Sequence, residues 1–276
     1  MKKVYLEITN ICNLNCSFCH GTSREKRLMT EQEYDFLTDA LKDKAEYLYF
    51  HLMGEPLMHP SLIQFVYQAK EKGFKPCITT NGTLLSEKGA ELARTAPYRV
   101  SISLHAPEGN GEFATEEYLH GCVEFARLAA DNGSFVAFRL WNGGGENVGN
   151  GRIIDKLKEN FTTKWTETRS GFRIADRIFL EFGEKFDWPD MEAPLYGEDI
   201  FCYGLRDQIG VLADGTVVPC CLDADGKAAL GNLFEASLEE ILESPRAKAI
   251  YDGFTCHRPS EELCRRCGFA ALKKMH

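Results

Sequence analysis

Three cysteines near the amino terminus have the spacing of ligands for a soft metal centre. Cys12, Cys16 and Cys19 form a C-x3-C-x2-C pattern. Thiolates held this close repel one another, and coordination to a soft metal removes that cost. Zinc usually takes four protein ligands, whereas this stretch supplies three. A [4Fe–4S] cluster has four iron corners, so three thiolates would leave one iron open to another ligand.

A second group of cysteines lies in the last third of the chain. Its members are Cys202, Cys220, Cys221, Cys256, Cys264 and Cys267. Asp214 and Gly215 form a hairpin-turn signature between two apolar stretches, so a hairpin can bring Cys202 and Cys220 together. Cys264 and Cys267 form a C-x2-C pair that could complete a four-thiolate site. From spacing alone, either structural zinc or an iron–sulfur cluster would suit this group.

Composition places these thiols in a reducing compartment. The chain has 276 residues, 11 cysteines and a formal net charge of −9. It begins with Met1-Lys2-Lys3 and a strand-like stretch, without an apolar signal region or a long apolar run, so we expect a cytoplasmic protein without membrane contact. The acidic balance disfavours nucleic-acid binding. Arg24, Lys26 and Arg27 form one basic group, either a solvated loop face or a docking site for an electron donor.

Strand-like and helix-like stretches alternate along the first two-thirds of the chain, which predicts parallel βαβ units. The predicted strands are residues 4–8, 46–52, 75–80, 98–104, 135–141 and 177–182. Six such units predict an α/β fold, a partial (β/α)6 barrel over residues 1–195. Residues 196–276 would form a small α+β extension. The carboxyl ends of parallel strands form the ligand site in such folds, so side chains there are the candidates for chemistry.

Helical periodicity predicts which side chains pack against this sheet. Thr30 and Glu33 form a capping box that opens a helix. A longer helix is expected from Thr115 to Asp131. Its predicted inner face comprises Tyr118, Cys122, Phe125, Leu128 and Ala129.

The amino-terminal cysteine stretch resembles the cluster loop of the radical S-adenosylmethionine (SAM) superfamily. It follows directly after the first predicted strand, and an aromatic residue, Phe18, precedes its last cysteine. The resemblance implies a [4Fe–4S] cluster on Cys12, Cys16 and Cys19, with SAM on the open iron. After the second strand, Met53, Gly54, Glu55 and Pro56 are similar to the family's Gly-Gly-Glu-Pro motif, with Met replacing the first Gly.

The same resemblance implies further cofactor contacts at the ends of later strands. The Gly54–Glu55 bend would face the SAM amino group, and Thr80 and Asn81 end the third strand. Ser103, on one face of the fourth strand with Ser101 and His105, is the candidate for the ribose. Arg139 lies in the fifth strand, where a buried guanidinium needs an anion. The SAM carboxylate is one partner, and a structural salt bridge with Glu181 or Glu7 is the alternative.

The carboxyl-terminal cysteines resemble the SPASM/twitch auxiliary-cluster extensions of this superfamily. The sequence from Val218 to Asp223 is similar to the one that is usual in these extensions. Six cysteines are fewer than the seven that two SPASM-type clusters need, so the resemblance implies one auxiliary [4Fe–4S] cluster. Its expected ligands are Cys202, Cys220, Cys264 and Cys267. Cys221 would point away from Cys220 in an extended chain, which leaves Cys221 and Cys256 as buried thiols, hydrogen donors or ligands of a second cluster.

This resemblance implies a function. SAM would be cleaved reductively to a 5′-deoxyadenosyl radical, with flavodoxin or ferredoxin as electron donor. The radical would abstract hydrogen from a peptide or small molecule, giving oxidation, epimerisation or crosslinking. Cys221 and Cys256 are candidate hydrogen donors, and His105 and Asp223 are candidate bases. The alternatives are a non-catalytic iron–sulfur carrier or sensor and a radical SAM enzyme acting on RNA.

Overall fold

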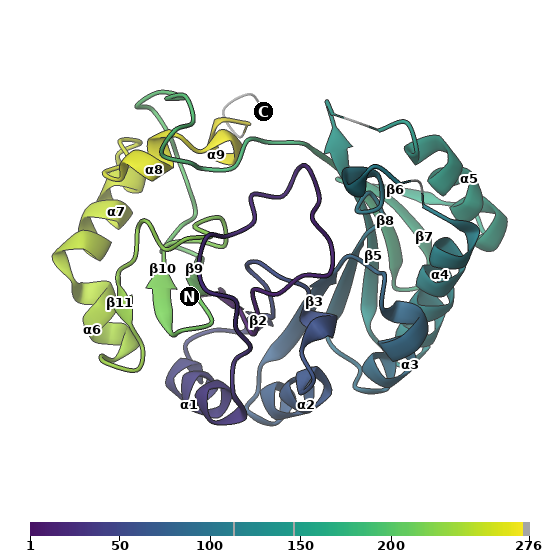
Figure 1. Cartoon of the computed structure of the whole chain (residues 1–276), viewed down its shortest axis with the longest axis horizontal. Coiled ribbons are helices and arrows are strands. Elements are labelled where there is room, and N and C mark those ends of the chain that lie inside the picture. The colour runs from purple at the N-terminus through teal and green to yellow at the C-terminus, as the bar shows by residue number, and fades with distance from the viewer. Residues whose placement is uncertain (113, 146, 273–276) are drawn as a thin grey trace.

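One curved sheet organises the whole molecule (Figure 1). The computed structural model describes residues 1–112, 114–145 and 147–272, so residues 273–276 of the predicted extension lie outside the described part. Within those ranges, eleven strands form a single sheet in the order β11-β10-β9-β1-β2-β3-β4-β5-β8-β7-β6. Helices cover its outer side, and the two ends of the sheet do not meet.

The strands and helices follow the alternation that the sequence predicts. The strands are β1 (Lys3–Leu6), β2 (Tyr47–Tyr49), β3 (Lys75–Thr80), β4 (Arg99–Ser103), β5 (Phe135–Gly143), β6 (Thr166–Thr168), β7 (Gly171–Ala175), β8 (Ile178–Glu184), β9 (Gln208–Val211), β10 (Thr216–Val218) and β11 (Gly231–Asn232). The helices are α1 (Glu31–Leu41), α2 (Leu62–Glu71), α3 (Leu85–Arg94), α4 (Glu116–Asp131), α5 (Asn150–Asn160), α6 (Leu238–Glu243), α7 (Pro245–Thr255), α8 (Glu262–Arg265) and α9 (Gly268–Leu272). Across the described ranges, no helix has both the length and the apolar character needed to cross a bilayer.

The centre of the sheet confirms the predicted partial barrel. β1 to β5 and β8 are paired in parallel, in the order β1-β2-β3-β4-β5-β8. Each expected strand is present, although β2 is shorter than predicted. Three strands were not predicted: β6 and β7, which form an antiparallel ribbon on β8, and β11 at the opposite edge of the sheet. The side chains of β6 are all exposed, so its sequence carries no apolar alternation that could have indicated a strand.

The carboxyl-terminal region extends this same sheet. β9 pairs in parallel with β1, with Lys3 opposite Gln208 and Leu6 opposite Val211. β10 turns back on β9 through the predicted hairpin, and β11 follows at the edge. The backbone carrying the second group of cysteines is therefore hydrogen-bonded to the strand that leads into the first group.

Alternation along the inner strands separates an apolar outer face from a polar interior. Val4 and Leu6 of β1 are fully buried in the hydrophobic core. Tyr5 between them lines a cavity inside the barrel, together with Tyr49 and His51. The interior of this partial barrel is thus a polar and aromatic chamber.

The predicted inner face of α4 is wrong at one position. Phe125 is buried as expected, but Leu128 is 37 % exposed. Leu119 and Val123 are buried in its place. The helix is rotated slightly because its apolar positions run along an i, i+3, i+4 stripe that begins at Leu119.

The two leucines of α4 provide a matched test of this packing. Leu119→Ala should lower the free energy of unfolding by about 2–5 kcal/mol, because it removes buried methyl groups and leaves a cavity. Leu128→Ala makes the same chemical change on the exposed side of the helix and should cost less than about 1 kcal/mol. Urea unfolding of both variants measures the difference. Equal losses would contradict the observed orientation of α4.

Candidate active site

The three amino-terminal cysteines lie together on the loop that follows β1. Cys12 and Cys19 are exposed and Cys16 is half-buried. Burial raises the pKa of the Cys12 and Cys16 thiols, and the charge of the neighbouring thiols in the loop raises it further. Such thiols resist ionisation unless a positive centre compensates them, which an iron–sulfur core would do.

Hydrogen bonds from distant segments fix this loop. Asn110 donates its side-chain amide to the Cys16 sulfur at 3.1 Å, and its side-chain oxygen accepts the Asn15 N–H at 2.9 Å. Trp188 donates its indole N–H to the Phe18 carbonyl at 3.0 Å. The cysteines are therefore presented by a braced loop (coloured purple in Figure 1) that crosses the space inside the curved sheet.

The predicted Met53–Pro56 motif lies directly beside the cysteine loop. Gly54 has a φ of +78°, and a Cβ there would stand 2.4 Å from the Thr9 carbonyl oxygen. Only glycine allows this approach. Met53, which replaces the first glycine of the family motif, is buried without a comparable clash, so the motif tolerates it.

Glu55 joins the loops that follow β2 and β3. Its carboxylate accepts the Asn81 N–H at 2.7 Å and the Leu57 N–H at 3.1 Å, and it is 2 % exposed. Burial raises the pKa of Glu55 to about 7. Its hydrogen bonds, including one from Thr80, favour the charged form and act in the opposite direction. Both carboxylate oxygens therefore already have partners within the protein, so positioning these loops is the first role of Glu55.

Two more predicted cofactor residues are close to this region. The Asn81 side-chain amide donates to the Asn13 side chain at 2.9 Å and lies 3.9 Å from the Cys12 sulfur. Ser103 ends β4, and its carbonyl accepts the Tyr118 hydroxyl, which also bonds the Asn81 carbonyl. The structure thus places Asn81 against the cysteine loop, and the Tyr118 hydroxyl links Ser103 to Asn81.

An ion pair between a buried carboxylate and a half-buried arginine connects the two halves of the site. Arg24 donates from one terminal nitrogen to both oxygens of Glu7, at 2.7 and 2.8 Å, and Glu7 is fully buried. The Glu7 carboxylate also accepts the N–H groups of Met53 and Ala213. Arg24 in turn donates to the Ala224 carbonyl at 2.8 Å. Arg24 is therefore not part of a solvated basic face, and the cysteine loop is connected to both neighbouring segments.

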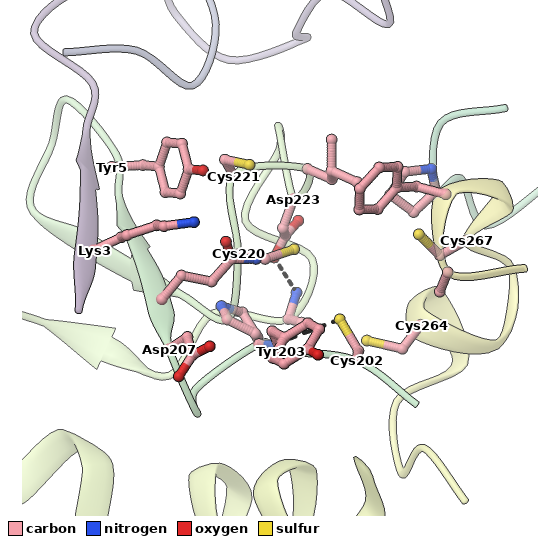
Figure 2. A pocket seen from close by; sticks show the side chains of 18 of the residues that line it. Lys3, Tyr5, Cys202, Tyr203, Asp207, Cys220, Cys221, Asp223, Cys264 and Cys267 are labelled. Atoms are coloured by element: carbon pink, nitrogen blue, oxygen red, sulfur yellow. Dashed lines mark hydrogen bonds between the residues drawn. The ribbon is translucent and has the colours of Figure 1, made fainter. Parts of the chain in front are cut away.

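The four expected auxiliary ligands face a common space (Figure 2). The sulfurs of Cys202, Cys220, Cys264 and Cys267 point toward one another from the β9–β10 hairpin region and the α8 segment. Burial raises the pKa of Cys220 and Cys264, and the other thiols of this set raise it further. A cationic iron–sulfur core would compensate all four thiolates at once.

No three His, Cys, Asp or Glu side chains in the described ranges are arranged to hold a single metal ion. A cubane places its thiolates on separate irons, so its ligands need not converge on one point.

The two remaining cysteines occupy different environments. Cys221 lines the same cavity as Cys220, against the expectation that adjacent cysteines would face opposite sides. The bend after β10 removes the extended geometry on which that expectation depended. Burial raises the pKa of the Cys221 thiol to about 11, and Tyr5 lies close to it in the same cavity. Cys256 is exposed at the end of α7 and does not line this cavity, so the structure gives no support to its candidate role as hydrogen donor.

The two candidate bases are engaged in local structure. Nδ1 of His105 lies 3.1 Å from the carbonyl oxygen of Arg139, in the middle of β5. Asp223 accepts the N–H groups of Lys227 and Ala228, each at 2.8 Å, and is 3 % exposed. Asp223 lines the cavity, but its carboxylate is already used to hold the following turn.

Arg139 lies directly opposite Ser103, another expected SAM-binding residue, in the β4–β5 pairing. It lines the interior cavity with Tyr5 and Tyr49, and its guanidinium stacks on Trp141 at 4.4 Å from the ring centroid. Its Nε is 3.7 Å from Glu181, so the alternative of a structural ion pair is only partly realised.

Sequence reasoning missed three residues of this region. Tyr5 was treated only as a member of an alternating strand, Glu7 was considered only as a partner of Arg139, and Arg24 was placed in a basic loop group. Glu7 could have been recognised from its position in the first predicted strand, directly before the cysteine loop, because a charged side chain in a core strand needs a partner. The residues next to Arg24 in the sequence did not indicate which carboxylate it pairs with.

Two family models match this chain. Residues 6–157 match the model described as the radical SAM superfamily. Residues 202–268 match the model described as the SPASM iron–sulfur cluster-binding domain. The two matches coincide with the parts of the chain that carry the two groups of cysteines.

Curated relatives match over shorter stretches. A tungsten-containing aldehyde ferredoxin oxidoreductase cofactor-modifying protein of Pyrococcus furiosus is 38 % identical over 93 residues, 32 % of this chain and 26 % of that protein. A probable GTP 3′,8-cyclase of Pyrobaculum aerophilum is 30 % identical over 111 residues, 39 % of this chain and 36 % of that protein. The chain thus matches about a quarter to a third of the length of these relatives.

Solved structures share the fold over nearly the whole chain. BtrN in complex with AdoMet and 2-DOIA has a TM-score of 0.56 and 19 % identity, covering 97 % of this chain and 92 % of that one. Streptococcus suis SuiB bound to S-adenosylmethionine has a TM-score of 0.62 and 17 % identity, with 98 % and 71 % covered. Native anSMEcpe with bound AdoMet has a TM-score of 0.64 and 15 % identity, with 99 % and 88 % covered.

The Glu7–Arg24 pair can be tested by removing one charge. Glu7→Gln should lower the free energy of unfolding by about 1–3 kcal/mol, because the half-buried Arg24 and the Met53 and Ala213 N–H groups lose a charged acceptor. Glu46→Gln removes an exposed partner of Lys75 and serves as the control, with little change expected. Thermal unfolding of anaerobic protein compares the two. A Glu7 variant as stable as the Glu46 variant would contradict the role given to this pair.

Proposed function

The chain belongs to the radical SAM superfamily, and from that membership we propose that it cleaves SAM reductively and removes a hydrogen atom from a peptide or small molecule. The cofactors of this family are a [4Fe–4S] cluster and SAM, and the SPASM region adds auxiliary iron–sulfur binding. The observation that carries the proposal is the cysteine loop at the end of β1, which lies against Gly54 and Asn81. The proposed division into functional regions is 1–195 and 196–276.

We assign the SAM-binding cluster to Cys12, Cys16 and Cys19. When bound, the cluster and SAM supply a 5′-deoxyadenosyl radical. The chain itself holds the cysteine loop in place through the hydrogen bonds of Asn110 and Trp188. Gly54 allows the bend after β2 to pack closely against the Thr9 carbonyl at the start of that loop. The residues proposed to contact SAM are Met53, Gly54, Glu55, Pro56, Thr80, Asn81, Ser103 and its neighbour on β5, Arg139.

We assign the auxiliary cluster to Cys202, Cys220, Cys264 and Cys267. These thiols form one wall of the interior cavity, and Tyr5 and other barrel side chains form the opposite wall (Figure 2). A substrate in this cavity would lie between the barrel and the auxiliary ligands. That position would suit an auxiliary cluster that anchors the substrate or accepts an electron from it, which favours an oxidation, an epimerisation or a crosslinking reaction.

The proposal includes two classes of substrate, peptides and small molecules. Two neighbours in fold have peptides bound: SuiB with the precursor peptide SuiA, and anSMEcpe with the Cp18Cys peptide. BtrN was solved with 2-DOIA. The open sheet and the interior cavity could admit either. Flavodoxin or ferredoxin is the proposed electron donor.

The amino-terminal cysteines give the most direct test of this function. The triple variant Cys12→Ala, Cys16→Ala, Cys19→Ala should lose about four iron atoms per chain, since one cubane loses its ligands. It should also form no 5′-deoxyadenosine from SAM with dithionite. Iron analysis and chromatography measure both quantities. Cys256→Ala, which changes an exposed cysteine outside the cavity, is the control and should retain both.

Continued formation of 5′-deoxyadenosine by the triple variant would overturn the assignment. A non-catalytic iron–sulfur carrier would behave differently again: the unaltered protein would hold iron but cleave no SAM. A SAM enzyme acting on RNA would bind RNA tightly and lose that binding as salt is raised.

The auxiliary site is tested separately by Cys264→Ala with Cys267→Ala. Loss of two ligands from α8 and the following residue should remove about four further iron atoms. Reductive SAM cleavage with dithionite should persist, because the amino-terminal loop is unchanged. An iron content equal to that of the unaltered protein would show that these cysteines hold no cluster.

A further inference from the structure

The three cysteines of the amino-terminal loop are not held in the same way. Two of them have partners on the barrel: Asn110 donates to the Cys16 sulfur at 3.1 Å, and the Asn81 amide lies 3.9 Å from the Cys12 sulfur. Cys19 donates its backbone N–H to the Cys16 carbonyl, but no hydrogen bond reaches its sulfur within the described part of the chain. The position of the Cys19 thiol therefore depends on how its own end of the loop is fixed.

The chain between β8 and the auxiliary region holds this end of the loop (Figure 1). Trp188 donates its indole N–H to the carbonyl of Phe18, the residue before Cys19, at 3.0 Å. Its ring lies nearly parallel to the imidazole of His20, the residue after Cys19, with ring centroids 6.1 Å apart. The Asp190 carboxylate is 3.8 Å from the same imidazole. Both neighbours of Cys19 thus contact this segment.

The same segment is joined to the auxiliary cysteines. Gly268, the residue after Cys267, donates its backbone N–H to the Asp187 carbonyl at 3.1 Å. A Cβ on Gly268 would stand 2.6 Å from that carbonyl oxygen, so the two backbones meet where only glycine fits. The Asp187 carboxylate accepts the Tyr196 hydroxyl at 2.6 Å, and the Tyr196 N–H donates to the Arg265 carbonyl at 3.0 Å. The end of α8 and the start of α9 therefore hold the segment in place.

Apolar packing supports these hydrogen bonds. The ring of Phe186 contacts both Phe269 and Trp188, with centroid distances of 5.0 and 5.6 Å. Phe186 and Pro189 also line the interior cavity, as do Cys267 and Phe269. The segment is thus packed against the auxiliary ligands on one side and bonded to the cysteine loop on the other.

A short path therefore connects one expected ligand of each cluster. The path runs from Cys267 to Gly268, across one hydrogen bond to Asp187, along the chain to Trp188, and across a second hydrogen bond to Phe18 and Cys19. Each step is a bond between neighbouring residues or one of these two hydrogen bonds. A displacement of α9 would therefore reach the backbone beside Cys19 through a contiguous set of contacts.

We propose that the segment from Phe186 to Asp190 transmits the state of the auxiliary site to the SAM-binding site, with Trp188 as its positioning residue. Auxiliary cysteines that hold their cluster fix α8 and α9, and the segment then keeps Cys19 in the geometry that binds SAM well. Without that support the loop is held less firmly and SAM binds more weakly. This inference rests on the proposed function, because it concerns the regulation of the same SAM site. Such coupling is measured by the non-additivity of changes made at the two ends.

Trp188→Phe tests the hydrogen bond to the loop, because the ring stays aromatic while the indole N–H is lost. In protein with both clusters reconstituted, SAM binding in anaerobic equilibrium dialysis should weaken about 3- to 10-fold, the range of one net hydrogen bond. The electron paramagnetic resonance signal of the reduced cluster with SAM should also shift, which a loss of overall stability would not cause. Trp165→Phe is the matched control, since Trp165 donates its indole N–H to the Phe161 carbonyl, also at 3.0 Å. Equal effects of the two variants would overturn the proposal.

The coupling is tested by adding Trp188→Phe to the Cys264→Ala, Cys267→Ala variant. The cysteine changes should themselves weaken SAM binding, because the segment loses its support. Trp188→Phe should then have no further effect on SAM binding. A loss by the same factor in both backgrounds would show that Trp188 acts on the loop without the auxiliary region, and the proposal would be wrong.

Gly268→Ala tests the same connection with every cysteine in place, which keeps the test decisive if the cysteine variant does not fold. The added methyl group should push α9 away from Asp187 and weaken SAM binding as Trp188→Phe does, and the two changes together should do no more than one. Gly151→Ala, on α5, adds the same group where nothing lies within 4 Å and is the control. A Gly268 variant that binds SAM as the unaltered protein does would contradict the inference.

Amide hydrogen exchange separates this inference from the proposed function. Without SAM, the peptide covering residues 12–24 should exchange faster in Trp188→Phe than in the unaltered protein, and this difference should vanish when the auxiliary cysteines are replaced. If exchange responds in this way but the unaltered protein forms no 5′-deoxyadenosine, the proposed function fails while the coupling stands. If SAM is cleaved and exchange in the loop does not respond, the coupling alone is wrong.

Discussion

The buried contact between Glu7 and Arg24 constrains everything around it. Glu7 directly follows β1 and accepts the N–H groups of Met53 and Ala213, while Arg24 donates to the carbonyl of Ala224. One carboxylate thus fixes the cysteine loop, the bend after β2 and the segment after β9. Because the Glu7 carboxylate is fully buried, a segment that moved away would leave this charge with fewer partners in the interior.

That constraint sets the position of the cavity. β9 pairs with β1, so the auxiliary cysteines are carried on the same sheet as the strand that leads to the amino-terminal cysteines. Thr22 and Ser23 add contacts to Asp225 at 2.6 and 3.0 Å. The barrel wall that carries Tyr5 and Arg139 therefore faces the auxiliary thiols across a fixed distance. A substrate held there would meet a prearranged site, which lowers the entropic cost of positioning it.

Local patterns predicted much of this arrangement, and long-range contacts account for what they missed. The cysteine spacings and the strand–helix alternation depend on neighbouring residues, so the partial barrel and both cysteine groups could be recognised from sequence. β6 could not, because its exposed side chains carry no periodic signal. The partner of Arg24 and the cavity position of Cys221 depend on how distant segments meet. The expected contact between Arg139 and the SAM carboxylate stays a prediction, and its contact with Glu181 at 3.7 Å is the one ion pair that the described structure gives it.

The central claim is that three thiolates hold a cluster whose open iron binds SAM. Electron–nuclear double resonance of the anaerobically reduced protein, with SAM labelled by 17O in its carboxylate, tests it most directly. The account predicts hyperfine coupling between the cluster and the labelled oxygen, and its loss when the three loop cysteines are replaced. A reduced cluster with the same spectrum in the presence and absence of labelled SAM would contradict it.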